Sequence, residues 1–205
     1  MSKRLAFLTA ALCGLFVAVP TKADNLVSNP GFETGDFGGW NLSGTDVPDN
    51  SGFFYGVDDL DPHAGGLAAY FGPVGGILNL TQTLSTTLGA TYTVSFWLDQ
   101  SVDTPAPYVN AFAISFGGAT LFTATDAPAS SYSQYSFSAT AASSSTDLAF
   151  AFRNDTGFFS LDDVSVTGAS AAVPEPGSAF LVLPFLLLLF LARREALRPA
   201  RASNI

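Results

Sequence analysis

The chain has 205 residues, of which 48% are hydrophobic and only 12% are charged, and its net charge is −9. This length suits one domain with appendages, and the 19 phenylalanines exclude a disordered chain. One cysteine and one histidine exclude a disulfide framework, an iron–sulfur cluster and a metal site built from several histidines. The acidic balance argues against nucleic acid as a partner, because phosphate binding requires a basic face.

The charge is unevenly distributed and divides the chain into three segments. Residues 24–172 hold fifteen acidic residues and one basic residue, Arg153, whereas the segments on either side have a net positive charge. Three segments of different charge suggest three different roles.

Residues 1–23 have the pattern of a secretory signal peptide. A basic pair precedes an apolar run over 5–19, and Thr21 and Ala23 supply small residues for cleavage before residue 24. An N-terminal membrane anchor is the alternative, but the apolar run is short and a cleavage site follows it. We therefore predict export by the Sec machinery.

Residues 178–192 form a second apolar run, which Arg193 and Arg194 follow. The run is shorter than the roughly 20 residues usual for a membrane-spanning helix, and only 173–192 reaches that length. A buried core helix is the alternative, but the run has no polar face and follows a proline-rich break. We predict a single transmembrane helix at 178–192 and a basic cytoplasmic tail at 193–205, which leaves the middle segment on the exported side.

A Pro-Glu-Pro motif lies in the predicted linker, residues 169–177, just before this helix. Its residues are Val173, Pro174, Glu175, Pro176 and Gly177. The order of this motif, a short apolar helix and a basic cluster resembles the PEP-CTERM sorting signal of Gram-negative bacteria that make exopolysaccharide or biofilm. The tail after the basic cluster is longer than is usual for that signal.

The resemblance to the PEP-CTERM signal implies recognition by an exosortase, a membrane-embedded cysteine protease or transpeptidase. It implies processing near the Pro-Glu-Pro motif and release to the cell surface or extracellular matrix. Before processing, the protein would be anchored in the inner membrane with its domain in the periplasm.

The middle segment, residues 24–168, has the alternating pattern of β-strands and no long helical periodicity. A Gly117-Gly118 pair predicts a hairpin turn, and residues 138–147 are predicted to form a flexible hairpin loop. Short strands with Gly and Asp turns at this spacing predict an all-β fold, a sandwich or jelly roll. The predicted strands are two within 67–84, then 91–99, 112–116, a short one around 121–122, 133–138, 147–153 and 162–166.

Four short motifs of this segment resemble carbohydrate-binding modules with the galactose-binding-like jelly roll. They are Asn25–Glu33 followed by Trp40, 63–66 before 68–70, 80–84, and the closing strand 159–166. The resemblance covers nearly all of 24–168 and implies a jelly-roll β-sandwich whose first and last strands lie close together. It does not define the ligand, because such modules bind many glycans and some bind none that is known.

The same resemblance implies a structural calcium ion between the first and last strands. It would be held by Glu33 and an Asp of the closing strand, Asp162 first, with Asp163 and Asp36 as lesser candidates. Calcium binds about six to eight oxygen ligands, which carboxylates and backbone carbonyls in turns supply. The alternative is that these acids cap turns or accept backbone hydrogen bonds.

Sugar binding requires an exposed aromatic face with polar groups beside it. Trp97 lies on the polar side of its predicted strand, and the alternative is that it packs under a loop or against the second sheet. Arg153 has the alternative of pairing with a nearby carboxylate, and Trp40 is expected in the core. The candidates for glycan contact are Trp97, Asp99, Gln100, Arg153 and Asn154, with Tyr55 and Tyr70 in reserve.

The sequence predicts no catalytic residues. The single histidine, His63, has turn-forming neighbours, and nothing places Asp58, Asp59 and Asp61 across a cleft. We therefore expect a non-catalytic secreted or cell-surface protein that binds glycan or associates with an exopolysaccharide or biofilm matrix. The alternatives are a purely structural surface protein without a sugar ligand and, more remotely, a small glycan-active hydrolase.

Overall fold

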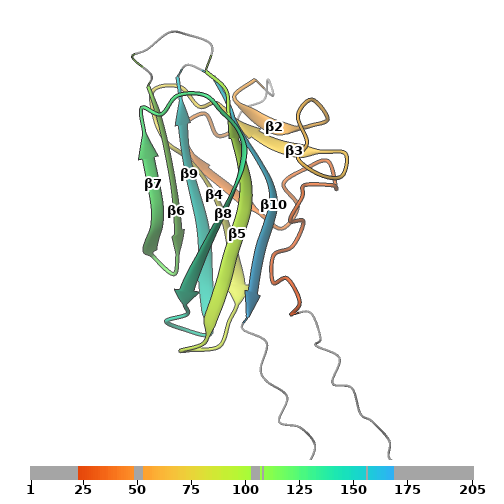
Figure 1. Cartoon of the computed structure of the whole chain (residues 1–205), viewed down its shortest axis with the longest axis vertical. Coiled ribbons are helices and arrows are strands. Elements are labelled where there is room, and N and C mark those ends of the chain that lie inside the picture. The colour runs from red at the N-terminus through yellow and green to blue at the C-terminus, as the bar shows by residue number, and fades with distance from the viewer. Residues whose placement is uncertain (1–22, 49–52, 103–106, 108, 156, 169–205) are drawn as a thin grey trace, which may run out of the picture. The chain divides into compact units, whose positions relative to one another are not determined.

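The computed structural model describes residues 23–48, 53–102, 107, 109–155 and 157–168 (Figure 1). All ten elements in this part are β-strands, and they form two five-stranded antiparallel sheets. The strands are β1 (Asn41–Gly44), β2 (Tyr55–Asp58), β3 (Ala68–Phe71), β4 (Leu78–Ser85), β5 (Thr91–Gln100), β6 (Asn110–Phe116), β7 (Ala119–Thr125), β8 (Ser130–Thr140), β9 (Ser145–Asn154) and β10 (Phe159–Gly168).

The first sheet has the order β1-β4-β9-β6-β7 and the second has the order β2-β3-β10-β5-β8. Most neighbouring strands are far apart in sequence, so the chain crosses repeatedly between the sheets, as it does in a jelly roll. The predicted all-β sandwich is confirmed. β1 and β2, which the sequence did not predict, are short strands at the sheet edges.

The inner faces of both sheets are filled with aromatic and aliphatic side chains. The predicted alternation in β5, β6 and β9 is confirmed, because every second residue of these strands is buried. Phe71 of the second sheet stacks on Phe152 of the first with ring centroids 4.1 Å apart. Trp40 is also buried, as expected, and stacks on Phe32. The core and both sheets are complete within residues 23–168, so this unit contains what it needs to fold.

The predicted hairpin at Gly117-Gly118 is confirmed and joins β6 to β7. Both glycines have positive φ angles, 58° and 80°. A tight hairpin turn with two positive φ angles matches the right-handed twist of the strands that it joins, and glycine adopts it without steric cost.

The prediction of a flexible loop over 138–147 is wrong at both of its ends. β8 continues to Thr140 and β9 begins at Ser145, which leaves a connection of four residues. Ala139 and Thr146 are buried, and the Thr146 hydroxyl contacts that of Thr86 at 2.7 Å. Small side chains that resemble a low-complexity loop in sequence fit here between the two sheets.

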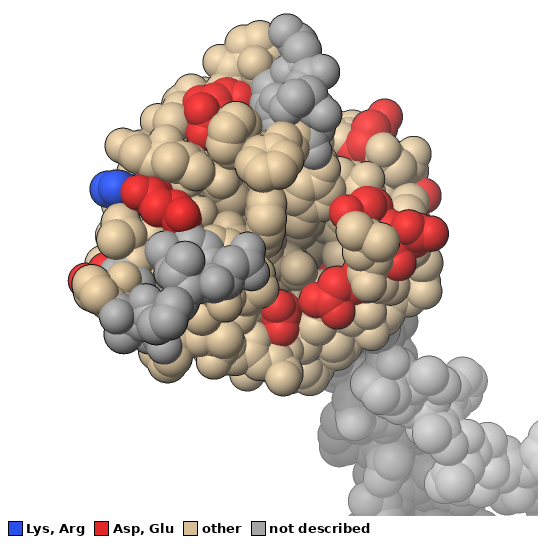
Figure 2. All heavy atoms as spheres, turned by 90° about the horizontal axis from the view of Figure 1, so that it is seen from above, with Lys and Arg blue, Asp and Glu red and all other residues tan. Residues whose placement is uncertain are grey.

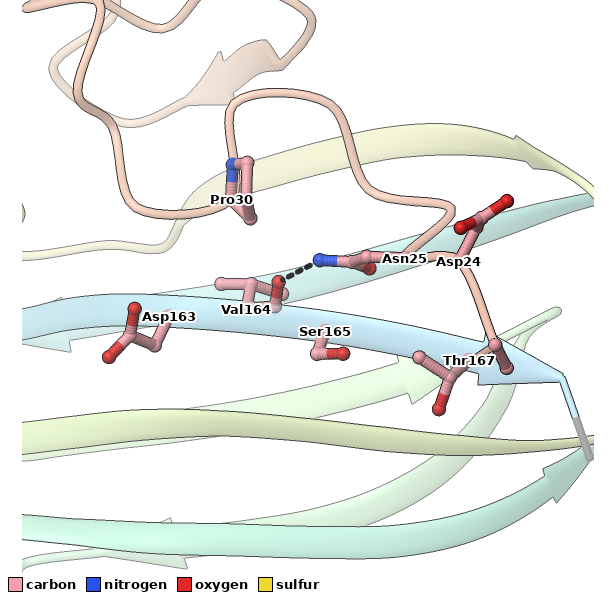
Figure 3. A pocket seen from close by; sticks show the side chains of 8 residues that line it. Asp24, Asn25, Pro30, Asp163, Val164, Ser165 and Thr167 are labelled. Carbon is pink, nitrogen blue, oxygen red and sulfur yellow. Dashed lines mark hydrogen bonds between the residues drawn. The ribbon is translucent and has the colours of Figure 1, made fainter. Parts of the chain in front are cut away.

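The start of the described chain lies along β10, the last strand. Asn25 forms an antiparallel bridge with Thr167, and its side-chain amide donates to the Val164 carbonyl while its side-chain oxygen accepts from Val166 N–H (Figure 3). The segment that lies beside β10 is therefore the start of the described chain, whereas the first strand, β1, belongs to the other sheet. A shallow pocket along this seam is lined by Asp24, Asn25, Pro30, Asp163, Ser165 and Thr167.

The predicted signal peptide, linker, sorting motif, transmembrane helix and cytoplasmic tail lie outside the described residues. Within the described ranges, no helix has the length and apolar character required to cross a membrane.

Candidate functional site

The outward side of the second sheet carries a group of aromatic and carboxylate side chains. Ser160 of β10 lies directly opposite Tyr70 of β3 on one side and Asp99 of β5 on the other. Two residues further along, Asp162 lies opposite Trp97. Because side chains two residues apart in a strand share a face, these residues lie on one side of the sheet, which we call the aromatic face, with Asp162 buried there beneath a loop.

Trp97 is half-buried because a loop covers part of it. The His63 ring stacks on the Trp97 ring with centroids 3.8 Å apart and planes 18° apart. His63 comes from the loop between β2 and β3, and its Nδ1 atom lies 2.8 Å from an Asp163 carboxylate oxygen. Trp97 therefore lies under a loop, as the alternative predicted, and the half-buried His63 ring covers one face of the Trp97 ring.

Tyr132 of β8 adds a third ring to the stacked pair. Its centroid lies 5.2 Å from that of His63 in an edge-to-face arrangement, and its hydroxyl donates to the Asp61 carbonyl at 2.8 Å. Burial raises the pKa of the Tyr132 hydroxyl, and the charges of nearby acids act in the same direction. Tyr132 therefore stays a neutral hydrogen-bonding group on this face.

Asp99 is the most perturbed carboxyl on the aromatic face. Burial, and secondly the negative charge of Asp61, raise the pKa of Asp99 to about 6 from the ordinary 3.8. A carboxyl whose pKa lies near neutral pH accepts hydrogen bonds when it is ionised, and it both donates and accepts them when it is protonated.

Further aromatic rings continue the face beyond Tyr70. Tyr70 packs edge-on against Phe158, and Phe158 packs edge-on against Phe53, of which 64% is exposed. A Cβ atom at Gly56 would overlap the Tyr70 ring, so glycine at this position of β2 leaves room for the ring to lie over the sheet. The result is a row of rings with hydroxyl and carboxyl groups between them.

A bulge in β10 creates a carboxylate cluster beside the aromatic face. The register with β5 shifts between Asp162 and Ser165, and Asp163 adopts a φ of 50°. Asp162 is completely buried, and its carboxylate accepts hydrogen bonds from the backbone N–H groups of His63, Ala64 and Asp163 at 2.7–3.1 Å. Asp162 thereby fixes the loop that carries His63.

Glu33 holds the same loop two residues further on. One of its carboxylate oxygens accepts from Gly66 N–H at 2.9 Å and from Leu67 N–H at 3.3 Å. The Gly31 backbone lies between these acids, since a Cβ atom there would be 3.3 Å from an Asp162 oxygen and 3.9 Å from an Asp163 oxygen. Of the four predicted calcium ligands, the structure brings Asp162 and Asp163 together, and His63 completes a group whose ligand atoms lie within 4.8 Å of one another. Glu33 holds the loop beside this group but does not belong to it.

The donors present fit a hard cation such as calcium. Burial raises the pKa of Asp162, and the negative charge of Asp163 adds to this effect, whereas the backbone hydrogen bonds lower it. Arg153 is the only Lys or Arg among the described residues, and it pairs with Asp155 instead. Asp162 Oδ1 and Asp163 Oδ2 each take part in one hydrogen bond, and a carboxylate oxygen can accept a second contact, which leaves room for a cation.

Asp36, the fourth predicted ligand, caps a turn. One of its oxygens accepts from Gly38 N–H at 2.9 Å and from the Thr34 hydroxyl at 2.6 Å, and the Thr34 hydrogen bond lowers the pKa of Asp36.

The other predicted glycan contacts lie away from the aromatic face. Gln100 and Asn154 were expected on polar sides of their strands but are buried, and their amides donate to the Ala127 and Ser101 carbonyls. Arg153 lies on the first sheet and forms two hydrogen bonds with Asp155, as its alternative predicted. Tyr55, the remaining reserve candidate, packs against the core beside Phe37.

The surface at one end of the sandwich is acidic. Figure 2 shows Asp and Glu side chains around a hollow in this end, with a small basic patch at its edge. Because Arg153 is the single basic residue of the described part, the whole described surface favours neutral or cationic ligands over anionic ones.

The fold is similar to solved carbohydrate-binding modules. The chain shares 19% identity and a TM-score of 0.54 with TmCBM61 in complex with β-1,4-galactotriose, and the match covers 72% of this chain and 100% of that one. It shares 15% identity and a TM-score of 0.51 with a xylan-binding domain of CBM 22, covering 73% of this chain and 98% of that one.

A third similar structure is the enzymatically active domain of tailspike protein 4 from bacteriophage CBA120. The identity is 17% and the TM-score is 0.53, with 71% of this chain covered but only 21% of the tailspike chain. No protein-family model and no curated protein matches this chain. The similarities therefore define the fold, a β-sandwich like that of carbohydrate-binding modules.

Sequence reasoning found Trp97, Asp99 and Tyr70 on this face but missed Tyr132, Ser160 and His63. Tyr132 lies two residues before the outward-facing Gln134 of the predicted strand 133–138. Extending that strand to Tyr132 would therefore have placed its side chain on this face. No sequence signal placed His63 on Trp97, because that contact joins a loop to a strand more than 30 residues away.

Proposed function

We propose that residues 24–168 form a non-catalytic glycan-binding module whose ligand lies on the aromatic face. The observation that carries this proposal is the row of half-exposed rings on the outer side of a sheet, with Asp99 and Ser160 between them. Aromatic rings stack on the apolar faces of sugar rings, and neighbouring polar groups bind the hydroxyls. The similarity in fold to modules whose names include galactotriose and xylan supports it.

A glycan array with the 24–168 unit, followed by calorimetry on the best ligand, tests this proposal. The array includes β-1,4-galactan and xylan, because these glycans occur with the similar structures. Trp97→Ala and Tyr70→Ala should each weaken binding about tenfold, which corresponds to about 1.4 kcal/mol. Thr81→Ala, on the outer side of the first sheet, is the matched control and should bind as the parent does. A folded unit that binds no glycan would favour a purely structural role.

A glycan-active hydrolase is the second candidate, and Asp99 is the observation that favours it. A carboxyl whose pKa is raised to about 6, next to the charge of Asp61, is the kind of group that acts as a general acid. We expect no shortening of any glycan that the module binds. Release of reducing ends that Asp99→Asn abolishes would replace the binding proposal with this one.

We propose that a calcium ion at Asp162 and Asp163 secures the loop over Trp97, with Glu33, which holds the same loop, as the further predicted ligand. When bound, the ion would neutralise carboxylates that no described Lys or Arg pairs with, since the partner of Asp163 is the His63 ring. Chelation with EDTA should lower the melting temperature of the 24–168 unit, and calcium should restore it. Glu33→Gln should melt at the same temperature with and without EDTA. An unchanged melting temperature of the parent after chelation would contradict the site.

We propose that the protein is exported, anchored by residues 178–192 and sorted by an exosortase to the surface or matrix of a Gram-negative bacterium. This proposal rests on the sequence motif around Glu175 and the basic pair that follows the apolar run. Replacing Glu175 by Gln should leave the uncleaved chain in the membrane fraction, whereas Glu195→Gln, in the tail, should be processed as the parent is. Normal release of the Glu175 variant would contradict sorting through this motif.

A further inference from the structure

β8 is an open edge of the second sheet. Within the described part of the chain it pairs only with β5, so its other side presents backbone N–H and C=O groups without a strand partner. It is the longest of the ten described strands, with 11 residues, and its register with β5 is regular from Ser133 to Thr140.

From Ser133 to Thr140 this edge lacks the features that usually prevent strand pairing, since its one register irregularity lies before Ser133. Natural edge strands are protected by charged side chains, proline, bulges or short length. Residues 130–140 contain no charged residue and no proline, and consist of Ser, Thr, Gln, Ala, Tyr and Phe. An unprotected regular edge is a template for another strand.

The residues of β8 and of the neighbouring strand β7 carry no charge themselves. β7 is the edge of the first sheet on the same side, since its Phe122 ring lies 5.2 Å from the Tyr135 ring of β8. From 109 to 146 the only charged residue is Asp126. We call the surface formed by β7 and β8 the neutral flank.

The charge distribution over the domain indicates which kind of partner fits the neutral flank. Two copies of an acidic domain repel each other wherever their charged surfaces meet, and the repulsion is smallest where both surfaces are neutral. A basic partner would instead be drawn to the acidic remainder of the surface. An identical strand also offers complementary backbone groups when it runs antiparallel.

We propose that β8 is a self-association edge, through which two copies of this chain pair antiparallel into one continuous sheet. The pairing is isologous, with a two-fold axis perpendicular to the sheet. This axis leaves the aromatic faces of both copies on the same side. A dimer would therefore present two glycan sites on one surface and bind a polysaccharide with avidity.

Sedimentation velocity on the 24–168 unit tests the edge. Ser136→Lys combined with Ser138→Lys should weaken dimerisation at least about tenfold, because Lys side chains from both copies meet at the seam. The matched control is Ser95→Lys with Thr93→Lys, the residues directly opposite on β5, which change the net charge equally but lie off the edge. The control should dimerise as well as the parent or better, since added positive charge reduces repulsion.

Salt and cross-linking provide two independent checks. Raising the salt from about 50 to 500 mM should strengthen dimerisation of the parent severalfold, because screening removes repulsion between the acidic copies. In the full chain with Cys13→Ser, Ser136→Cys should give a disulfide-linked dimer and Ser95→Cys should not.

A parent unit that stays monomeric at about 1 mM in high salt, or an edge variant that dimerises like its control, would overturn the proposal. Glycan binding by the monomeric edge variant separates this result from the proposed function. A module that binds glycan as a monomer keeps its function without the dimer, and a dimer without glycan binding keeps the edge without the function.

Discussion

The two sheets of the sandwich have similar inner faces and different outer faces. The outward residues in the middle of the first sheet are small, such as Ala111, Ala113, Ala149 and Ala151. The outer face of the second sheet carries Trp97, Tyr132 and Tyr70 instead, with buried and half-buried carboxylates beside them. Core packing constrains only the inner faces, so the outward rings are not required by the core. The difference therefore indicates where the chain carries its chemistry.

The largest effect that separates the two faces should come from their aspartates. Asp162→Ala should destabilise the 24–168 unit by about 3 kcal/mol, because three part-buried backbone N–H groups lose their acceptor. Asp147→Ala, on the outer side of the first sheet, removes one exposed hydrogen bond from the Thr83 hydroxyl and should cost less than about 1 kcal/mol. Urea unfolding measures both, and equal losses would mean that the loop over Trp97 is not fixed by Asp162.

A pair of glycines tests the same loop with backbone strain held constant. Gly65 and Gly75 have φ angles of 69° and 77°, so alanine at either position costs about 1 kcal/mol of strain. At Gly65 the added Cβ would also overlap the Glu33 carboxylate, whereas at Gly75 it meets nothing within 4 Å. Gly65→Ala should therefore unfold about 2 kcal/mol more easily than Gly75→Ala. If the two variants unfold alike, Glu33 does not hold this loop.

The strands of the domain were predictable because burial on one face produces alternation that is visible in sequence. Thr91–Gln100 and Ser145–Asn154 alternate without interruption, since each is an inner strand with partners on both sides. At Leu98 and Gln100, near the end of β5, the alternation in sequence no longer shows which way the side chains point. A register irregularity lies between them, and Gln100 points inward although it follows a polar residue.

The candidate site was predictable only in part, because its geometry depends on contacts between distant segments. Trp97 and Asp99 are two residues apart in one strand, and the alternation correctly placed both on one face. The β10 bulge that buries Asp162 and turns Asp163 toward His63 has no counterpart in a regular alternating pattern. The stack of His63 on Trp97 likewise follows from how Asp162 and Glu33 hold the loop, which the sequence does not reveal.

Stability as a function of pH should change in opposite directions for two carboxyls. The pKa of Asp99 is raised to about 6, so its protonated form is favoured in the folded state and stability is gained as the pH falls from about 7 toward 4. The pKa of Asp155 is lowered by the hydrogen bond from Arg153, so the stability that it contributes is lost as the pH falls below its ordinary 3.8.

Urea unfolding of the parent, Asp99→Asn and Asp155→Asn across pH 3–7 measures these trends as differences from the parent. Relative to the parent, Asp99→Asn should lose stability on acidification and Asp155→Asn should gain it. Parallel curves for the two variants would show that the environment of Asp99 does not differ from that of an exposed carboxyl.

The smallest effect should come from Arg153, the only described basic residue. It forms two hydrogen bonds with Asp155, but both side chains are partly exposed and only two residues apart. Exposed ion pairs contribute little to stability, so Arg153→Ala should unfold at nearly the same urea concentration as the parent. It lies on the first sheet, and glycan affinity should be unchanged. If Arg153→Ala lost glycan affinity without losing stability, the binding site would lie on the opposite side of the sandwich. The small outward residues of the first sheet would then have to form that site.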